Sequence, residues 1–247
     1  MILSKNEFLP ILKTNSKNIR KKVLVCGDPG RADKIAEFLT EAEEISYNRE
    51  YKLFNGFYNK QPVSILSHGV GGPGAGVAFK ELIKGGAEEI IRVGTAGSLS
   101  KDIKDGDLVI AAAAVRNDGL TDQLVDKSYP AAADWELIAR LNRKAEELDI
   151  KTTTGIVSTI AAFYPELEPL TNNYFSQAGV IAVEMEASAL FVIASLNRVK
   201  AAAVLAVDGI AVDFDADSYN PHRVKVSQAV EREIVLALEA LTGEDKN

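Results

Sequence analysis

Residues 23–39 predict three elements in direct succession: a buried strand, a tight turn and a helix. The apolar run Val23-Leu24-Val25-Cys26 is typical of a short buried strand, and the glycines and proline of residues 27–30 break it. The apolar residues that follow recur at helical spacing, at Ala32, Ile35, Ala36 and Leu39. A turn of this kind leaves backbone N–H groups unpaired at the start of the helix, where an anion can bind. The segment therefore predicts a strand–turn–helix unit with a candidate anion site.

Arg31 lies in the first turn of that helix, where the helix dipole slightly disfavours a cation. A cation placed against this bias indicates an anion held between the arginine and the N–H groups. A surface arginine on an ordinary strand–helix turn explains the residue equally well.

The same alternation of strands and helices continues along the rest of the chain. Apolar strands are predicted at residues 63–67, 89–93, 107–115, 155–158 and 201–207, and helices at 75–84, 135–148, 185–196 and 226–241. A hairpin near residues 51–66 adds antiparallel strands. We therefore predict an α/β fold, a three-layer αβα sandwich around a central mixed, largely parallel twisted sheet. No linker, repeat or low-complexity segment interrupts the pattern, which predicts a single domain over residues 1–247.

Composition and charge narrow the classes of partner and compartment. The 28 lysines and arginines against 35 aspartates and glutamates give a net charge of −7, which argues against a general nucleic-acid binder but allows a local basic pocket. No apolar run approaches the ~18 residues of a membrane span. Residues 1–22 lack the apolar core of a signal peptide, and the single cysteine, Cys26, cannot form an intrachain disulfide. These features predict a cytoplasmic protein that binds neither nucleic acid nor membrane.

The segments after the predicted strands are the glycine-rich and polar parts of the chain. They are residues 27–31, 68–74, 94–98, 158–164 and 208–213. Ligands in open α/β sheets bind beyond the carboxyl ends of the strands. We therefore predict that these segments converge on one pocket.

Arg92 is a charged residue inside an apolar strand, Ile90-Ile91-Arg92-Val93. Such a charge is costly unless it is paired or liganded. Because the planar guanidinium matches phosphate oxygens, one interpretation joins Arg92 to Arg31, Gly27 and Thr95 in a phosphate-binding site. The alternative is an edge strand from which Arg92 faces solvent.

Three acidic residues are candidates for the same pocket. Glu184 and Glu186 lie at the predicted start of a helix, where acids complement the helix dipole, but one of them could instead accept hydrogen bonds from sugar hydroxyls. Asp208 directly follows an apolar strand. A carboxyl group there serves as a general acid if burial raises its pKa, whereas a turn or helix cap is the alternative.

The segment 69–74 matches the dinucleotide-binding pattern G-x-G-x-x-G, with Glu88 and Glu89 about 20 residues further on. A binder of NAD or a similar dinucleotide is therefore one hypothesis. Pro73 stiffens the loop, however, so a tight turn that lets the following helix pack closely is the favoured interpretation. The only two histidines, His68 and His222, match no metal-ligand spacing, and no metal site is predicted.

Six motifs in this order resemble those of the hexameric nucleoside phosphorylases, which include bacterial and protozoan purine nucleoside phosphorylases and uridine phosphorylases. They are Gly27-Asp28-Pro29-Gly30-Arg31, Asn48-Arg49, Ser67-His68-Gly69-Val70-Gly71, Ile91-Arg92-Val93-Gly94-Thr95-Ala96-Gly97, Val183-Glu184-Met185-Glu186 and Val207-Asp208. The resemblance covers residues 8–241. It implies a transferase of nucleoside salvage that uses inorganic phosphate as co-substrate and no cofactor. Phosphate attacks C1′ of a nucleoside and releases the base and ribose 1-phosphate.

The resemblance also implies roles for the residues that match the family's motifs. Phosphate would be bound by Gly27, Arg31, Arg92 and Thr95, and by Arg49 from the neighbouring subunit of a homohexamer built as a trimer of dimers. Ribose would be bound by Glu184, Met185 and Glu186, with Glu186 on the 2′ and 3′ hydroxyls. The base would contact Ala96, Gly97, Phe163, Tyr164, Val183 and Asp208. Asp208 would protonate purine N7 as the base leaves, assisted by Arg223.

The resemblance favours a purine base, with the 6-oxopurine nucleosides inosine and guanosine ahead of adenosine. Uridine phosphorylases usually lack an acid at the position of Asp208. They hold uracil with a glutamine and an arginine that follow the aromatic pair, where this chain has Glu166, Leu167 and Glu168. Carboxylates only accept hydrogen bonds, so they cannot replace that pair.

Two departures from the family pattern keep other substrates and activities open. The segment Pro10-Ile11-Leu12 stands where the family usually supplies a histidine to the ribose 5′-hydroxyl, so a 5′-methylthio nucleoside such as methylthioadenosine also fits. Residues 157–163 lack the usual serine–aspartate pair of the base pocket. The alternatives on this fold are a uridine phosphorylase and a methylthioadenosine phosphorylase. Two separate alternatives are a nucleosidase that uses water in place of phosphate and a dinucleotide binder of the NAD type that uses the glycines of residues 69–74.

Overall fold

The computed structural model describes residues 7–164, 166–212 and 223–243, and His222 lies outside these ranges. A short hairpin of β1 (Phe8–Leu9) and β2 (Thr14–Asn15) comes first. The other strands are β3 (Lys22–Cys26), β4 (Thr40–Asn48), β5 (Tyr51–Tyr58), β6 (Gln61–Ser67), β7 (Glu89–Ser98), β8 (Leu108–Asn117), β9 (Ala131–Ala132), β10 (Thr152–Ile160), β11 (Ala182–Glu184) and β12 (Lys200–Ile210). The helices are α1 (Pro29–Ala36), α2 (Gly72–Gly85), α3 (Trp135–Glu147), α4 (Asn172–Gln177), α5 (Ala187–Leu196) and α6 (Val224–Thr242), with 3₁₀ turns η1 (Ser16–Asn18) and η2 (Thr121–Gln123).

Ten strands of the described chain form one mixed sheet in the order β11-β10-β8-β12-β7-β3-β6-β5-β4, with β9 paired to β8. Parallel pairings join β3 to β6 and β7, β12 to β7, and β10 to β8 and β11. The predicted hairpin near residues 51–66 is the antiparallel pair β5–β6. Because β11 also pairs with β7, at Val183 opposite Gly97, the strands β7, β12, β8, β10 and β11 close into a ring.

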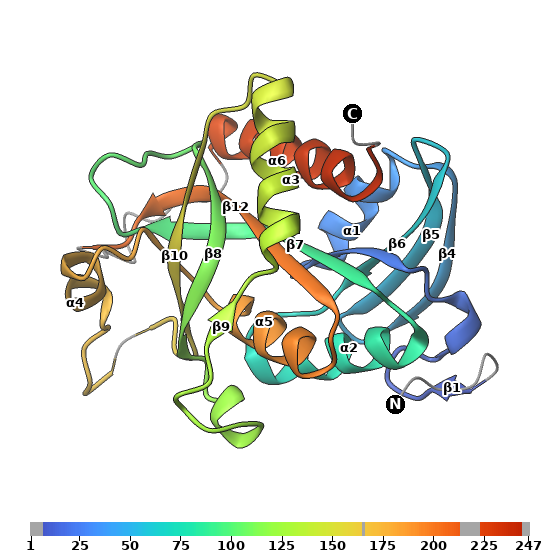
Figure 1. The fold of residues 1–247 in the computed structure, drawn as a ribbon, viewed down its shortest axis with the longest axis horizontal. Coiled ribbons are helices and arrows are strands. Elements are labelled where there is room, and N and C mark those ends of the chain that lie inside the picture. Colours follow the sequence, from blue (N-terminus) through green and yellow to red (C-terminus); the bar gives the residue numbers. More distant parts are fainter. Residues whose placement is uncertain (1–6, 165, 213–222, 244–247) are drawn as a thin grey trace.

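Helices cover both faces of this sheet (Figure 1). On one face, α2 and α5 pack against the strands through residues such as Phe79, Leu190 and Phe191. On the other face, α1, α3 and α6 pack through Ile35, Leu141 and Leu238. Strands buried on both faces are apolar along their length, as the run 201–207 of β12 is. The predicted three-layer α/β arrangement is therefore confirmed.

Two strands extend further than the apolar runs predict. β7 continues through Thr95 to Ser98, and β12 continues through Asp208 to Ile210. The reason is that the two strands pair with each other to their ends, with Val207 opposite Ala96 and Ile210 opposite Ser98. The register shifts between Val207 and Gly209, so Asp208 lies at a bulge in β12 instead of following the strand. Bulges redirect side chains, and they are frequent beside functional sites.

The predicted start of the helix at residues 185–196 is also wrong. Glu184 is the last residue of β11, where it pairs with Thr159 of β10, and α5 begins only at Ala187. The parallel pairing with β10 therefore holds this acid in the sheet. Across the described ranges, no helix is long and apolar enough to cross a membrane.

Candidate active site

A cavity of about 680 Å³ opens at the carboxyl ends of β3, β7 and β12. All five segments that follow the predicted strands contribute to its wall, through Gly27, Arg31, Gly69, Thr95, Ala96, Gly97, Phe163 and Asp208, among others. Arg92, Val183, Glu184, Met185 and Glu186 complete the set of predicted residues that line it. A cavity of this size suits a small molecule.

The start of α1 forms one part of this cavity. Asp28 is the N-cap, and its carboxylate accepts hydrogen bonds from the backbone N–H groups of Gly30 and Arg31, both at 3.1 Å. The expectation of unpaired N–H groups at this helix start is wrong for these two, because the chain supplies its own carboxylate there. The Arg31 side chain lines the cavity, and its Nη1 lies 3.5 Å from a carboxylate oxygen of Glu233.

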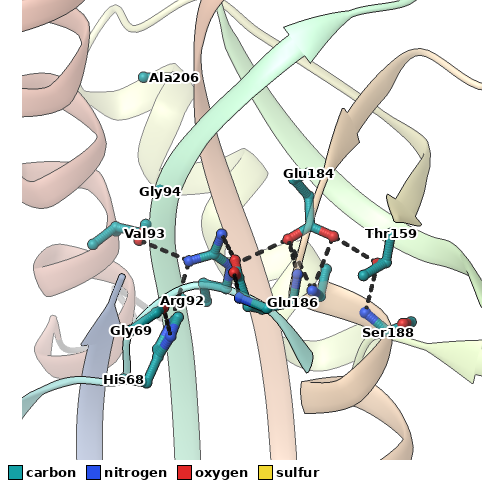
Figure 2. A network of polar contacts seen from close by, with 12 residues as sticks. His68, Gly69, Arg92, Val93, Gly94, Thr159, Glu184, Glu186, Ser188 and Ala206 are labelled. Carbon is teal, nitrogen blue, oxygen red and sulfur yellow. Dashed lines mark hydrogen bonds and ion pairs between the residues drawn. The ribbon is translucent and has the colours of Figure 1, made fainter. Parts of the chain in front are cut away.

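Arg92 is at the centre of a buried polar network, which Figure 2 shows. Its guanidinium donates to Glu186 at 2.5 Å and to Glu184 at 3.3 Å. The residue is 4% exposed and β7 is a central strand, so the interpretation of a solvent-facing arginine on an edge strand is wrong. Burial disfavours the charged guanidinium, but the carboxylates of Glu186 and Glu184 outweigh it and raise the pKa of Arg92.

The two acids beside Arg92 have different surroundings. Glu184 accepts hydrogen bonds from the N–H groups of Glu186 at 2.8 Å and Ala187 at 2.9 Å, and from the Thr159 hydroxyl at 2.6 Å. Its carboxylate therefore stabilises the start of α5. Glu186 accepts from the Gly71 N–H at 2.5 Å as well as from Arg92. Burial raises the pKa of Glu186 and neighbouring Glu184 adds to that effect, while Arg92 opposes it.

His68 is a third buried partner of Arg92, to which the sequence analysis assigns no role. Its Nδ1 lies 2.8 Å from the Gly69 carbonyl oxygen and must carry a proton to donate there. Nε2 is then left as an acceptor, 3.3 Å from Arg92 Nη1. Burial and the nearby Arg92 charge lower the pKa of His68, so the ring is neutral at physiological pH. Within the described ranges, no group of three His, Cys, Asp or Glu side chains could hold a metal ion.

Another part of the cavity is apolar and contains Asp208. Ile160, Phe163, Val183 and Ile210 line it. Asp208 is 3% exposed and reaches the cavity from the bulge in β12. Asn172, which no sequence motif identifies, also lines the cavity, and its side-chain amide donates to the Ala211 carbonyl at 2.8 Å. Apolar walls with a buried carboxyl group suit a largely apolar ring that takes up a proton.

Three predicted site residues do not line this cavity. Arg49 is exposed and lies at a left-handed turn between β4 and β5, with a φ of 58°. Tyr164 is 65% exposed and packs edge-on against Phe163, with ring centroids 4.9 Å apart. Arg223 forms an ion pair with Asp105, because the start of α6 lies beside the loop before β8. Among the described residues, no ion pair or hydrogen bond joins Arg223 to Asp208, and the assistance of Asp208 by Arg223 stays a prediction.

Glu233 is a buried acid close to the site that the sequence analysis did not identify. Its Oε2 accepts hydrogen bonds from the N–H groups of Ala206 at 3.0 Å and Gly94 at 3.3 Å. Burial raises the pKa of Glu233 to about 8, although Arg31 and Arg92 lower it. A signal was available: Glu233 follows Val226 and Val230 at helical spacing and so lies on the apolar face of the predicted helix.

Comparisons with known proteins agree on one family. The model of the Phosphorylase superfamily matches residues 21–242. The purine nucleoside phosphorylase of Plasmodium falciparum is 39% identical over 220 residues, which cover 87% of this chain and 90% of that protein. The uridine phosphorylase of Thermococcus kodakarensis is 39% identical over 202 residues, 77% of this chain and 73% of that protein. The crystal structure of Toxoplasma gondii purine nucleoside phosphorylase in complex with immucillin-H matches with 30% identity and a TM-score of 0.92, and 97% of each chain is covered.

Proposed function

The chain belongs to the phosphorylase superfamily and is a nucleoside phosphorylase, and we propose that its substrates are purine nucleosides, with inosine and guanosine ahead of adenosine. The products are the free base and ribose 1-phosphate. The observation that supports this most strongly is the set of groups in one cavity. The cavity contains Arg31, Arg92 and the Glu186 carboxylate, which is held by Arg92. It also contains Asp208, which lies among apolar side chains.

Inorganic phosphate is the co-substrate in this proposal. Arg31, Thr95 and the backbone of Gly27 bind its oxygens, and Arg92 shares its donors between phosphate and Glu186. A phosphate oxygen attacks C1′, the C1′–N9 bond breaks, and its electron pair passes to the base. Because positive charge develops on the ribose in the transition state, the phosphate dianion is also its counter-charge.

Glu186 orients the ribose. Its carboxylate accepts hydrogen bonds from the 2′ and 3′ hydroxyls, while Gly71 and Arg92 hold it from the protein side. Since Arg92 contacts Glu186 directly, phosphate and ribose bind to one connected set of charges. Correct placement of the two reactants lowers the entropic part of the barrier.

The choice of base is the finer part of the proposal, because the relatives include purine and uridine phosphorylases at equal identity. Asp208 supports a purine, since a buried carboxyl group can give a proton to N7 as the base leaves. Glu166, Leu167 and Glu168 are exposed and do not line the cavity, and their side chains cannot supply the glutamine and arginine that the resemblance associates with uracil.

We propose that the site is completed across a subunit interface. Arg49 is exposed on the turn between β4 and β5 and does not line the cavity of its own chain. An exposed arginine on a short turn suits a contact with a bound anion in a neighbouring subunit. In the proposed homohexamer, a trimer of dimers, each dimer exchanges Arg49 between its two phosphate sites.

Nucleosides with an apolar 5′ substituent are a second candidate substrate class. The carboxylate of Glu81 accepts hydrogen bonds from the N–H groups of Ile11 at 3.1 Å and Leu12 at 2.9 Å, and Asn48 donates to the Ile11 carbonyl at 2.8 Å. These contacts fix Ile11 beside the turn that carries Arg49. If Arg49 reaches a neighbouring site, Ile11 is placed near it, and an apolar side chain there favours a 5′-methylthio group over a hydroxyl.

A substrate panel tests the base and the 5′ group together. Base release is measured with inosine, guanosine, adenosine, uridine and methylthioadenosine, each with and without phosphate. We expect phosphate-dependent release of purines, fastest from inosine and guanosine. Turnover of uridine alone would contradict the assignment of Asp208, and preference for methylthioadenosine would favour the second candidate.

A further inference from the structure

Glu233 is a buried acid that the proposed reaction does not use. It comes from α6, and its side chain is fully buried behind Arg31. Both of its backbone hydrogen bonds go to one oxygen, Oε2, and come from Gly94 and Ala206. The other oxygen, Oε1, accepts no hydrogen bond from the described part of the chain and lies 3.5 Å from Arg31 Nη1. One oxygen of this carboxyl group therefore stabilises the backbone of β7 and β12, and the other oxygen faces a cation of the proposed phosphate site.

We propose that Glu233 is a positioning residue for phosphate. Its carboxyl group orients the Arg31 guanidinium from the protein interior, and its ionised form competes with bound phosphate for interaction with that guanidinium. This inference rests on the proposed phosphate site and deepens it. Glu233 does not line the cavity, so it acts through Arg31 and does not touch the reacting atoms.

The charges around Glu233 make this competition dependent on pH. Two guanidinium groups face it, Arg31 from α1 and Arg92 from β7. Cys26 from β3 is also near, but burial raises the pKa of its thiol to about 12, so it stays neutral. Burial raises the pKa of Glu233 to about 8. The carboxyl group is therefore largely protonated at neutral pH and ionises as the pH rises through about 8.

The sign of the effect follows from linkage. A phosphate dianion beside Arg31 disfavours a second negative charge at Glu233, so phosphate binding favours proton uptake by Glu233. By reciprocity, ionised Glu233 weakens phosphate binding by the same factor. Phosphate affinity should therefore be highest with Glu233 protonated and should fall as the pH rises through about 8.

Glu233→Gln separates the two halves of the carboxyl group. The glutamine side-chain oxygen can still accept from Gly94 and Ala206, because both donors already share one oxygen. The amide cannot ionise, so it cannot compete for Arg31. Glu231→Gln is the matched control, since Glu231 is an exposed acid two residues earlier on the same helix.

The experiment is calorimetric titration with inorganic phosphate from about pH 7 to about pH 9.5, a range that brackets the Glu233 pKa of about 8. Above about pH 8, phosphate itself is almost entirely the dianion, so its own ionisation contributes little. For the wild type and E231Q we expect Kd to rise on the order of tenfold, which corresponds to a phosphate-induced pKa change of about one unit. For E233Q we expect Kd to stay near the wild-type value at low pH.

A second measurement needs only the wild-type protein. Titrations in buffers of different ionisation enthalpy report proton uptake, which we expect on phosphate binding between about pH 8 and about pH 9. Glu186 also has a raised pKa, and the difference between wild type and E233Q separates the two acids. Phosphate binding without proton uptake, or with equal pH dependence in E233Q, would overturn this inference alone. Failure of the wild type to bind phosphate at any pH would overturn the proposed function and this inference with it.

Discussion

At the scale of single residues, the site depends on buried charges that hold one another in place. Arg92 contacts Glu184, Glu186 and His68, and each of these partners has a further fixed contact, to Thr159, Gly71 and Gly69 respectively. Removing one partner of a buried ion pair leaves an uncompensated charge, which typically costs about 3–5 kcal/mol. The arginine is therefore rigid before any ligand binds, which favours catalysis by preorganised charge.

The first prediction concerns the acid in the apolar part of the cavity. Asp208→Asn should lower kcat for inosine by about 10²–10⁴-fold, because an amide cannot give a proton to the leaving base. Cleavage of 7-methylguanosine, whose base is already activated at N7, should fall far less. Steady-state kinetics with both nucleosides measures the ratio. Equal losses on the two substrates would show that Asp208 supports the structure and not proton transfer.

Sequence reasoning identifies the charged residues of the site better than their partners. Arg92 stands out as a charge within an apolar strand, and Asp208 as an acid after one. The helical spacing of Glu233 with Val226 and Val230 indicates that it is buried, but no local pattern identifies the partners of Glu233 or of His68. The bond between His68 and Arg92 spans 24 residues, and the bond between Glu233 and Gly94 spans 139. Contacts of that range depend on the folded sheet and not on neighbouring residues.

At the scale of elements, the turn before α2 connects the fold to the site. Gly71 is the N-cap of α2 with a φ of 93° and a ψ of 152°, a conformation that is essentially limited to glycine. Its N–H and the Arg92 guanidinium are the two donors to the Glu186 carboxylate within the described residues. The G-x-G-x-x-G pattern therefore serves to shape a turn against Glu186, which agrees with the tight turn favoured for this loop.

Gly71→Ala and Gly86→Ala form a matched pair on α2. Both glycines have positive φ, and an added Cβ meets nothing within 4 Å at either position. Each substitution should lower the free energy of unfolding by about 1–3 kcal/mol through backbone strain alone. Only G71A should also lower kcat/KM, by about tenfold or more, because a displaced Gly71 N–H releases Glu186. Thermal unfolding measures the stability of the two variants, and steady-state kinetics measures kcat/KM of their folded fractions. Equal kcat/KM values for G71A and G86A would argue against a role of the Gly71 N–H in holding Glu186.

The order of the elements follows from the sequence, but several of their ends do not. Apolar runs and helical spacing locate β3, β6, β10, α3 and α6. The extension of β7 and β12 comes from their mutual pairing, and the bulge at Asp208 arises within that pairing. The closure of the sheet by β11 against β7 likewise joins segments that are remote in sequence.

At the scale of the whole molecule, the proposed site needs residues from two subunits. Arg49 lies outside the cavity of its own chain, whereas Arg31 and Arg92 line it. Arg31 and Arg92 belong to the same chain as the cavity that they line. For this reason, the sequence of one chain is enough to predict a phosphate site. Which subunit uses Arg49 is not encoded in any local pattern, since it depends on how the chains assemble.

Mixing two inactive variants tests this exchange. Arg49→Ala removes an arginine from the site of the neighbouring subunit. Asp208→Asn instead inactivates the site of the chain that carries the substitution. In a mixed dimer, the R49A chain keeps Asp208 and receives Arg49 from its partner, so one site is intact. We expect co-expressed chains to show activity well above that of either variant alone. Activity no greater than the average of the two parents would mean that Arg49 serves its own chain or no site at all.

The fate of the ribose distinguishes phosphorolysis from hydrolysis. The protein is incubated with inosine and inorganic phosphate, and ribose 1-phosphate and hypoxanthine are quantified by phosphorus NMR and absorbance. Phosphorolysis predicts that the two products form in equal amounts and that neither forms without phosphate. Release of hypoxanthine with free ribose in the absence of phosphate would contradict the account and identify water as the nucleophile.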